Sequence, residues 1–200
     1  MKNILFIINP ISGGKDKRSF PDKIIQYLDL DKFNPDFVFT ERINHAYQLA
    51  KQAIDTGVDI IVAVGGDGTV NEVASVLVSS DQIMGIIPLG SGNGLARTLG
   101  IPVNEKEAIQ RLNELKVDHI DSGIFNNRHF FGIAGIGFDA HVSACFASNQ
   151  TRGLTGYIHT VLTEVIGYQS QHYTIEVDGK LFEREAFIIS IANSSQYGNN

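Results

Sequence analysis

The sequence predicts an α/β protein with a doubly wound, mostly parallel sheet, followed by an antiparallel, β-rich second domain. Three observations support this prediction. Short apolar strands alternate with amphipathic helical segments as far as residue 121, and period-two alternation replaces that pattern afterwards. Three of the early strands run directly into glycine-containing polar loops. Alternation of strands and helices is typical of a parallel sheet that carries helices on both faces.

Five strands and four helices are expected in the first part of the chain, together with a short helix that follows the third polar loop and stops at Gly100. The strands are predicted at 4–8, 36–40, 58–64, 84–90 and 117–121, and the helices at 20–28, 44–57, 70–77 and 104–112. Asn44 and Asn104 are predicted N-caps, with Glu107 completing a capping box and Gly57 ending its helix. The continuous apolar run at 58–64 indicates a strand that is covered on both faces.

The pattern changes near residue 122, so we predict domains at 1–122 and 123–200. Residues 173–185 alternate apolar and polar side chains around Asp178-Gly179, which is a strong signal for a β-hairpin. The other expected elements are a helix at 156–168 and a core strand at 186–193. Because the sequence ends soon after that strand, we expect it to be a fragment whose β-rich domain is incomplete.

Composition argues against several classes of function. The chain has 200 residues, 43% of them hydrophobic, which is enough for a sizeable core. Its net charge of −6 argues against a nucleic-acid binder or a strongly electrostatic membrane binder. No run approaches the roughly 18 uninterrupted apolar residues of a membrane span. A cytoplasmic location is the expectation.

The cysteine and the histidines give little sign of a reactive or metal site. Cys145 is the only cysteine, so an intrachain disulfide is excluded and a reducing compartment is expected. It lies in an apolar run, which favours a buried structural thiol over a nucleophile. The six histidines lack metal-ligand spacing and are interpreted as surface or core residues.

The first polar loop, residues 9–19, follows the first predicted strand. Gly13 and Gly14 allow backbone N–H groups to turn toward an anion, and Lys15, Lys17 and Arg18 add positive charge. The loop lacks the spacing of a Walker A motif. A phosphate site and a solvated basic loop are about equally compatible with it.

The second loop is Gly65-Gly66-Asp67-Gly68-Thr69, between a buried strand and a helix. Its glycines allow the backbone to approach a ligand closely, and the free N–H groups of the next helix lie at the same place. Asp67 would repel phosphate unless Mg²⁺ or its water ligands lie between the two groups. The alternative is that Asp67 only caps the helix, but glycine on both sides favours a ligand site.

The third loop lies within residues 88–100 and offers Ser91 and Asn93 to a base, ribose or phosphate. Alone, it could equally be a polar turn in the left-handed conformation. Three such loops after strands of one parallel sheet should gather at the same edge, which strengthens the interpretation as a ligand site. Asp121 ends the last strand of the first domain, where a role at a cleft and a boundary cap are both open.

The blocks "NPISGG", "GGDGTVNEV" and "PLGSGNGLAR" in this order resemble the diacylglycerol kinase catalytic-domain family. That family includes soluble bacterial diacylglycerol kinases, sphingosine kinases and ceramide kinase. The resemblance extends from residue 3 through "VDHIDSGIFNNRHFFGIAGIGFDA" to "AFIISIANSSQYGNN" at the end. The Gly-Gly-Asp-Gly-Thr loop alone would be less specific, because NAD kinases and phosphofructokinases have a similar loop.

The resemblance implies an ATP-binding α/β domain similar to that of NAD kinases and phosphofructokinases, then a β-sandwich domain. It implies that ATP binds Asn9, Pro10, Ile11, Ser12, Gly13, Thr40, Gly65, Gly66, Asp67, Gly68, Thr69, Val70, Asn71, Glu72, Gly90, Ser91, Gly92 and Asn93. Asp67, Asp121, Lys15 and Arg18 would be catalytic. Asp67 and Asp121 would hold Mg²⁺ through water. The general base and a structural metal loop are expected beyond residue 200, so ATP binding without turnover is expected of the fragment.

The leading functional prediction is an ATP-dependent lipid kinase that phosphorylates a hydroxyl of a diacylglycerol or sphingoid-type acceptor. Contact with a membrane would then be peripheral and transient. Two alternatives remain open: an NAD kinase-like enzyme, and a non-catalytic regulator that binds nucleotide.

Overall fold

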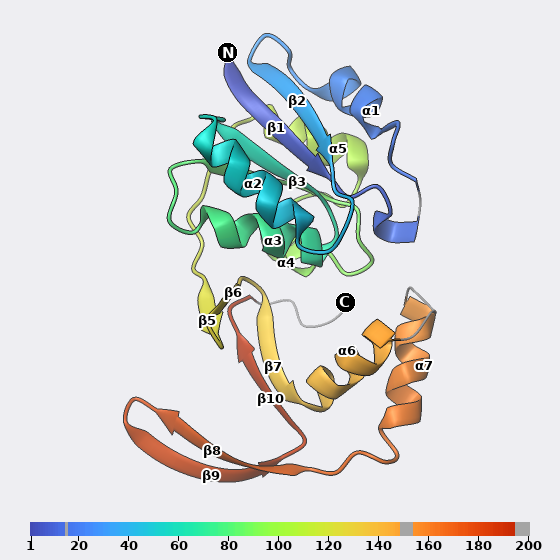
Figure 1. The fold of residues 1–200 in the computed structure, drawn as a ribbon, viewed down its shortest axis with the longest axis vertical. Helices are drawn as coiled ribbons and strands as arrows, with labels where there is room; N and C mark the ends of the chain where they lie inside the picture. Colours follow the sequence, from blue (N-terminus) through green and yellow to red (C-terminus); the bar gives the residue numbers. More distant parts are fainter. Residues whose placement is uncertain (15, 149–153, 195–200) are drawn as a thin grey trace. The chain divides into compact units, whose positions relative to one another are not determined.

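The structure is a computed structural model that describes residues 1–14, 16–148 and 154–194. The chain divides into two compact units. The first consists of Met1–Gly132 together with the described residues from Asn193 onward, and the second of Ile133–Ala192. Figure 1 labels the helices and strands of both units.

The first unit contains a four-stranded parallel sheet. Its strands are β1 (Lys2–Ile8), β2 (Phe33–Phe39), β3 (Ile60–Gly65) and β4 (Ile83–Pro88), in the spatial order β2-β1-β3-β4. The register pairs Ile4 with both Pro35 and Ile60. Every residue of β3 is buried, as the continuous apolar run predicted.

Helices cover both faces of this sheet, which confirms the doubly wound fold (Figure 1). Figure 1 shows α2 (His45–Asp55) and α3 (Asp67–Leu77) on one face, with α1 (Phe20–Tyr27) and α5 (Glu105–Leu112) on the other. Ile61 and Ala63 of β3 pack toward α2 and α3, whereas Val62 and Val64 pack toward α1 and α5. The two faces of one strand therefore supply two cores. Smaller helical elements are η1 (Ser12–Gly14) and α4 (Gly94–Thr98).

The predicted N-cap of α5 is confirmed, and Asn44 occupies the predicted N-cap position of α2 but does not cap that helix with its side chain. The Asn104 side chain accepts hydrogen bonds from the backbone N–H groups of Lys106 and Glu107 at 3.0 and 3.2 Å. Asn44 does occupy the N-cap position, but its φ is 64° and its side chain makes no capping bond. The Glu72 carboxylate from α3 instead accepts the N–H groups of Asn44 (2.9 Å) and Ala46 (3.1 Å).

The strand predicted at 117–121 does not form. Residues 116–122 carry no regular secondary structure, and Val117 and Ile120 are 49% and 45% exposed. These two apolar residues lie three positions apart, so the segment lacks the period-two alternation that seats one face of a strand on a core. Strand β4 and this segment both line a cavity of about 670 Å³. A short antiparallel pair, β5 (Gly123–Phe125) and β6 (Arg128–Phe130), follows it.

The second unit combines antiparallel strands with two helices. Its elements are β7 (Ile133–Gly137), α6 (Phe138–Ser148), α7 (Leu154–Glu164), β8 (Gln171–Val177), β9 (Lys180–Ala186) and β10 (Ile188–Ala192). Strand β7 pairs with β10, and β8 with β9. The predicted hairpin is confirmed, because Asp178 (φ 50°) and Gly179 (φ 75°) form a two-residue turn between paired Val177 and Lys180.

Other details of this unit differ from the sequence prediction. Helix α6 was not expected, and α7 ends at Glu164, before Gly167, rather than at residue 168. The predicted core strand exists as β10, but Ile188 and Ile191 are 37% and 47% exposed. Among the helices that the structure describes, none is both long and apolar enough to cross a membrane.

Candidate functional site

The candidate site lies at the carboxyl ends of two neighbouring strands whose following helices pack on opposite faces of the sheet. Strand β1 leads to α1 on one face, while the adjacent strand β3 leads to α3 on the other. In open parallel sheets this switch point leaves a crevice at the carboxyl ends of the strands, where ligands bind. The loops after β1, β3 and β4 all begin at this edge, as the sequence predicted.

Asn9 joins the first loop to the second. Its Nδ2 donates to Thr69 Oγ1 at 3.3 Å, and its backbone N–H donates to the Val64 carbonyl at 2.9 Å. Its Oδ1 accepts the N–H of Ile11 at 3.2 Å, and its own carbonyl accepts the Ser12 hydroxyl at 3.0 Å. The polar groups of Asn9 and Ser12 thus hold the loop in shape.

Close backbone packing joins the second loop to the third. The Leu89 N–H donates to the Gly65 carbonyl at 2.8 Å. A Cβ on Gly90 would lie only 2.5 Å from the Gly66 Cα, and one on Gly13 (φ 63°) would lie 2.5 Å from the Leu89 carbonyl oxygen. Glycine is required at positions 13 and 90 for packing between the loops, before any ligand is considered.

Asp67 is held by the third loop. Its Oδ2 accepts the N–H of Asn93 at 2.8 Å, and its Oδ1 accepts the N–H of Gly94 at 2.7 Å. The Asn93 side chain in turn bonds the N–H and the carbonyl of Gly90 at 2.8 and 2.9 Å. The cap considered from the sequence is thus made on α4, the next helix along the chain, rather than on α3.

The N-terminus of α3 is open. Val70 N–H donates to the Gly66 carbonyl, and among the described residues no side chain caps the helix at Gly66. Gly68 is exposed, and a Cβ placed on it would meet nothing within 4 Å. The orphan N–H groups of this first turn and the positive end of the helix dipole suit an anion.

The predicted basic residues lie in different environments. Lys17 is buried, with Nζ 3.4 Å from a Glu105 carboxylate oxygen, and Lys23 forms an ion pair with the other oxygen. Burial alone would raise the pKa of Glu105, but the hydrogen bonds and charges of Lys23 and Lys17 outweigh it and lower that pKa. Arg18 is exposed and 4.0 Å from the Asp16 carboxylate. Lys15 lies outside the described residues.

Arg97 is a cation of this loop region that the sequence reasoning missed. Its Nε donates to the Gly92 carbonyl at 3.0 Å, which fixes the guanidinium beside the third loop. The remaining guanidinium N–H groups are positively charged hydrogen-bond donors. The signal was available, because Arg97 stands on the short helix that was expected after the Gly-Ser-Gly-Asn loop.

The other predicted site residues fall into two groups. The first group is buried or makes structural hydrogen bonds, and it consists of Thr69, Val70, Glu72, Thr40 and Pro10. The Thr40 N–H donates to the Ile8 carbonyl at 2.9 Å, and the Pro10 carbonyl accepts the Lys17 N–H at 3.1 Å. Exposed are Ile11, Asn71 and Ser91, with Gly92 half-buried. Asp121 is exposed, and its backbone carbonyl accepts the Asn193 side chain at 2.8 Å.

The comparisons with known proteins agree with this geometry. Residues 3–124 match the family described as the diacylglycerol kinase catalytic domain. The chain belongs to this family. Residues 132–200 match the YegS C-terminal NAD kinase beta sandwich-like domain, which confirms the β-sandwich part of the predicted fold.

Relatives and solved structures match nearly the whole chain. A diacylglycerol kinase of Staphylococcus saprophyticus is 30% identical over 96% of this chain and 65% of its own length. One of Bacillus subtilis is 30% identical over 97% of this chain and 66% of its own length. A crystal structure of a diacylglycerol kinase from Bacillus anthracis superposes with a TM-score of 0.78 at 29% identity, covering 99% of this chain and 66% of that one. The chain therefore spans just under two thirds of these relatives.

The structure also gathers three side chains in the second unit that the sequence reasoning did not connect. His141 and Cys145 lie one turn apart on α6, and both contact or approach Glu164 on α7. The i, i+4 spacing of the histidine and the cysteine was visible, but no helix was predicted there. Cys145 is half-buried rather than buried.

Proposed function

We propose that the protein transfers the γ-phosphoryl group of ATP to a hydroxyl group of a lipid, in a reaction assisted by Mg²⁺. The acceptor belongs to the diacylglycerol or sphingoid class. Family membership supports the reaction class, as does the name diacylglycerol kinase that the relatives carry. The observation that carries the proposal is the open N-terminus of α3, with Gly68 exposed, at the switch point between β1 and β3.

The residues around this helix end suit a nucleoside triphosphate. The N–H groups of the first turn of α3 would bind phosphate oxygens, as helix N-termini do in other nucleotide sites. The loop at residues 9–13 is already fixed by the Asn9 bonds, so binding would require little ordering of the backbone. Arg97, and Lys15 or Arg18 from the first loop, would supply positive charge toward the phosphates.

The carboxylate of Asp67 suits a magnesium ion held through water. Each of its oxygens accepts one backbone N–H and retains a second lone pair, because an ionised carboxylate has about four acceptor sites. Because an N–H group already occupies one acceptor site on each oxygen, contact with the ion through its water ligands is favoured. Mg²⁺ usually keeps several of its waters. Asp121 is the second carboxylate of the proposal. Bound Mg²⁺ would neutralise charge on the transferred group.

The chain's own residues would act chiefly by positioning. Phosphoryl transfer proceeds without a protein-bound covalent intermediate, so alignment and charge neutralisation supply most of the rate enhancement. The three loops are held together by backbone contacts at Gly66, Gly90 and Leu89. Donors that are fixed before the reaction need no reorganisation as charge develops.

The test is transfer from labelled ATP by the full-length protein to a panel of acceptors: diacylglycerol, monoacylglycerol, sphingosine, ceramide and NAD. We expect label in a lipid product, dependent on Mg²⁺. The match of the second part of the chain to an NAD kinase beta sandwich-like domain makes NAD the necessary rival. Label in NAD would contradict the proposal and indicate an NAD kinase. ATP binding without transfer to any acceptor would replace it with a nucleotide-binding regulator.

Asp67→Asn tests the assigned role of the carboxylate. We expect transfer to fall to background while the circular dichroism spectrum of the fold remains. We also expect a loss of about 1–2 kcal/mol of stability, because one of two charge-assisted hydrogen bonds to the third loop is lost. Asp55→Asn, at the exposed end of α2, is the matched control and should leave phosphoryl transfer and stability unchanged. Substantial transfer by folded Asp67→Asn would contradict the assignment.

A further inference from the structure

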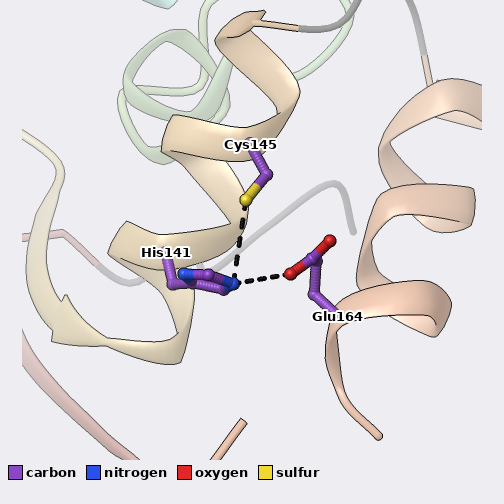
Figure 2. Close-up of side chains that lie close together, drawn as sticks. All are labelled: His141, Cys145 and Glu164. Carbon is purple, nitrogen blue, oxygen red and sulfur yellow. Dashed lines mark hydrogen bonds and ion pairs between the residues drawn. The ribbon is translucent and has the colours of Figure 1, made fainter. Parts of the chain in front are cut away.

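Three potential metal ligands converge in the second unit (Figure 2). His141 Nε2 lies 2.7 Å from Glu164 Oε2, and Cys145 Sγ lies 3.7 Å from the same Nε2. All three ligand atoms lie within 4.8 Å of one another, and all three residues are half-buried. His141 and Cys145 come from consecutive turns of α6, and Glu164 is the last residue of α7.

The arrangement differs from that of a catalytic triad. In a Cys-His-acid relay, the thiol and the carboxylate contact opposite nitrogens of the imidazole ring. One nitrogen then takes the proton from the thiol, while the carboxylate on the other nitrogen orients the ring. Here both groups approach the same atom, Nε2. Convergence of three donor atoms from three side chains on one point is the pattern that a metal ion organises.

The distances are close to those of a tetrahedral centre. With Zn–S near 2.3 Å and Zn–N near 2.0 Å, tetrahedral geometry places the nitrogen and sulfur about 3.5 Å apart. The Nε2–Sγ distance of 3.7 Å is within a few tenths of an ångström of that value. Nitrogen and oxygen ligands would stand about 3.3 Å apart, so the 2.7 Å His141–Glu164 contact must open on metal binding. Glu164 is the last residue of α7, and rotation of its side chain would lengthen this contact.

We propose that His141, Cys145 and Glu164 bind a divalent transition metal of the Zn²⁺ class. A set of one thiolate, one imidazole and one carboxylate suits Zn²⁺, whereas Mg²⁺ prefers oxygen ligands alone. The site is thus chemically distinct from the Mg²⁺ expected for phosphoryl transfer. It connects α6 to α7 by three coordinate bonds within one compact unit.

The surroundings leave a fourth position accessible. A cavity of about 450 Å³ borders His141 and Glu164 and is lined also by Thr163, Tyr168 and Gln171. The Tyr168 ring packs 5.3 Å from the His141 ring, centroid to centroid, and limits its rotation. Three protein ligands with one open position are typical of zinc sites that accept water or another small ligand. Water is the expected fourth ligand here.

The test is metal uptake by the tag-free protein after removal of metal with a chelator. We expect one Zn²⁺ per chain, measured by competition with a chromophoric chelator, and no displacement by a large excess of Mg²⁺. Substitution by Co²⁺ should give the visible bands of a tetrahedral centre and a near-ultraviolet thiolate-to-cobalt band. Absence of stoichiometric Zn²⁺ uptake by the folded protein would overturn the proposal.

Two variants locate the site. Cys145→Ser and His141→Gln should each weaken Zn²⁺ binding by about 100-fold or more, since even loss of a supporting outer group costs 10- to 100-fold. Cys145→Ser should also abolish the thiolate-to-cobalt band. His159→Gln, an exposed histidine on α7, is the matched control and should bind as the parent does. Parent-like affinity in folded Cys145→Ser and His141→Gln would refute the assignment, and circular dichroism establishes that each is folded.

Discussion

The substitution Gly68→Ala tests phosphate binding at the N-terminus of α3 without disturbing the packing between the loops. Gly68 occupies the first turn of α3, it is exposed, and a Cβ there would meet nothing within 4 Å. Its φ is not positive, so alanine adopts the same backbone conformation. A Cα–Cβ bond in a helix tilts toward the helix N-terminus, which is where the proposed phosphate would lie.

The expected effects on stability and on ATP binding have opposite signs. Replacing glycine by alanine in an exposed helical position stabilises a protein by about 0.5–1 kcal/mol. Obstructing one N–H donor to a charged phosphate removes a hydrogen bond of about 1.5–3 kcal/mol. The second figure corresponds to a rise in the KM for ATP of roughly 10- to 150-fold, at 1.4 kcal/mol for each factor of ten.

Steady-state kinetics and urea denaturation measure these two effects. Gly90→Ala is the informative contrast, because its Cβ would lie 2.5 Å from the Gly66 Cα and 2.9 Å from Asn93 Oδ1. That variant should lose about 1–3 kcal/mol of stability through overpacking, and activity with it. An unchanged KM for ATP in stable, folded Gly68→Ala would refute phosphate binding at this helix end.

Two further predictions concern carboxylates near the site. The lowered pKa of Glu105 means that its stabilising effect is complete above the ordinary value of 4.5 and is lost as pH falls through the lower folded value. Glu105→Gln should therefore reduce the free energy of unfolding at neutral pH, and chemical denaturation should show this deficit shrinking in acid; a deficit independent of pH would contradict the ion-pair account. Glu72→Gln should cost about 0.5–2 kcal/mol by weakening the cap of α2 without changing the KM for ATP; a large rise in KM would return Glu72 to the nucleotide site.

Features governed by local rules could be predicted from the sequence. The turn at Asp178-Gly179 requires two residues with positive φ, which this pair adopts readily, so the hairpin and its register follow from the sequence. Asn104 caps α5 through N–H groups two and three residues away. The gathering of three loops at one edge follows from the parallel sheet itself.

Features that depend on distant partners could not be predicted in this way. Asn44 has the right residue type for a cap, but the cap is supplied by Glu72, 28 residues later. The family resemblance placed Glu72 among the ATP-binding residues, and sequence spacing gave no sign of its bonds to the start of α2. His141 and Glu164 are 23 residues apart and meet only because α6 and α7 pack together. Sequence spacing does not reveal such pairs unless both helices are already placed.

The carboxylate of Asp67 connects the architecture of the site to its proposed chemistry. Both of its oxygens are fixed by backbone N–H groups of the third loop, so its position does not depend on a bound ligand. A Cβ on Gly92 would lie 2.9 Å from Asp67 Oδ2, and a Cβ on Gly90 would push the second and third loops apart. The glycines that suggested a phosphate loop are therefore needed first to hold a carboxylate in place. A carboxylate fixed beside N–H groups that suit phosphate would repel a bound phosphate unless a cation lies between the two. The proposed magnesium ion would be that cation.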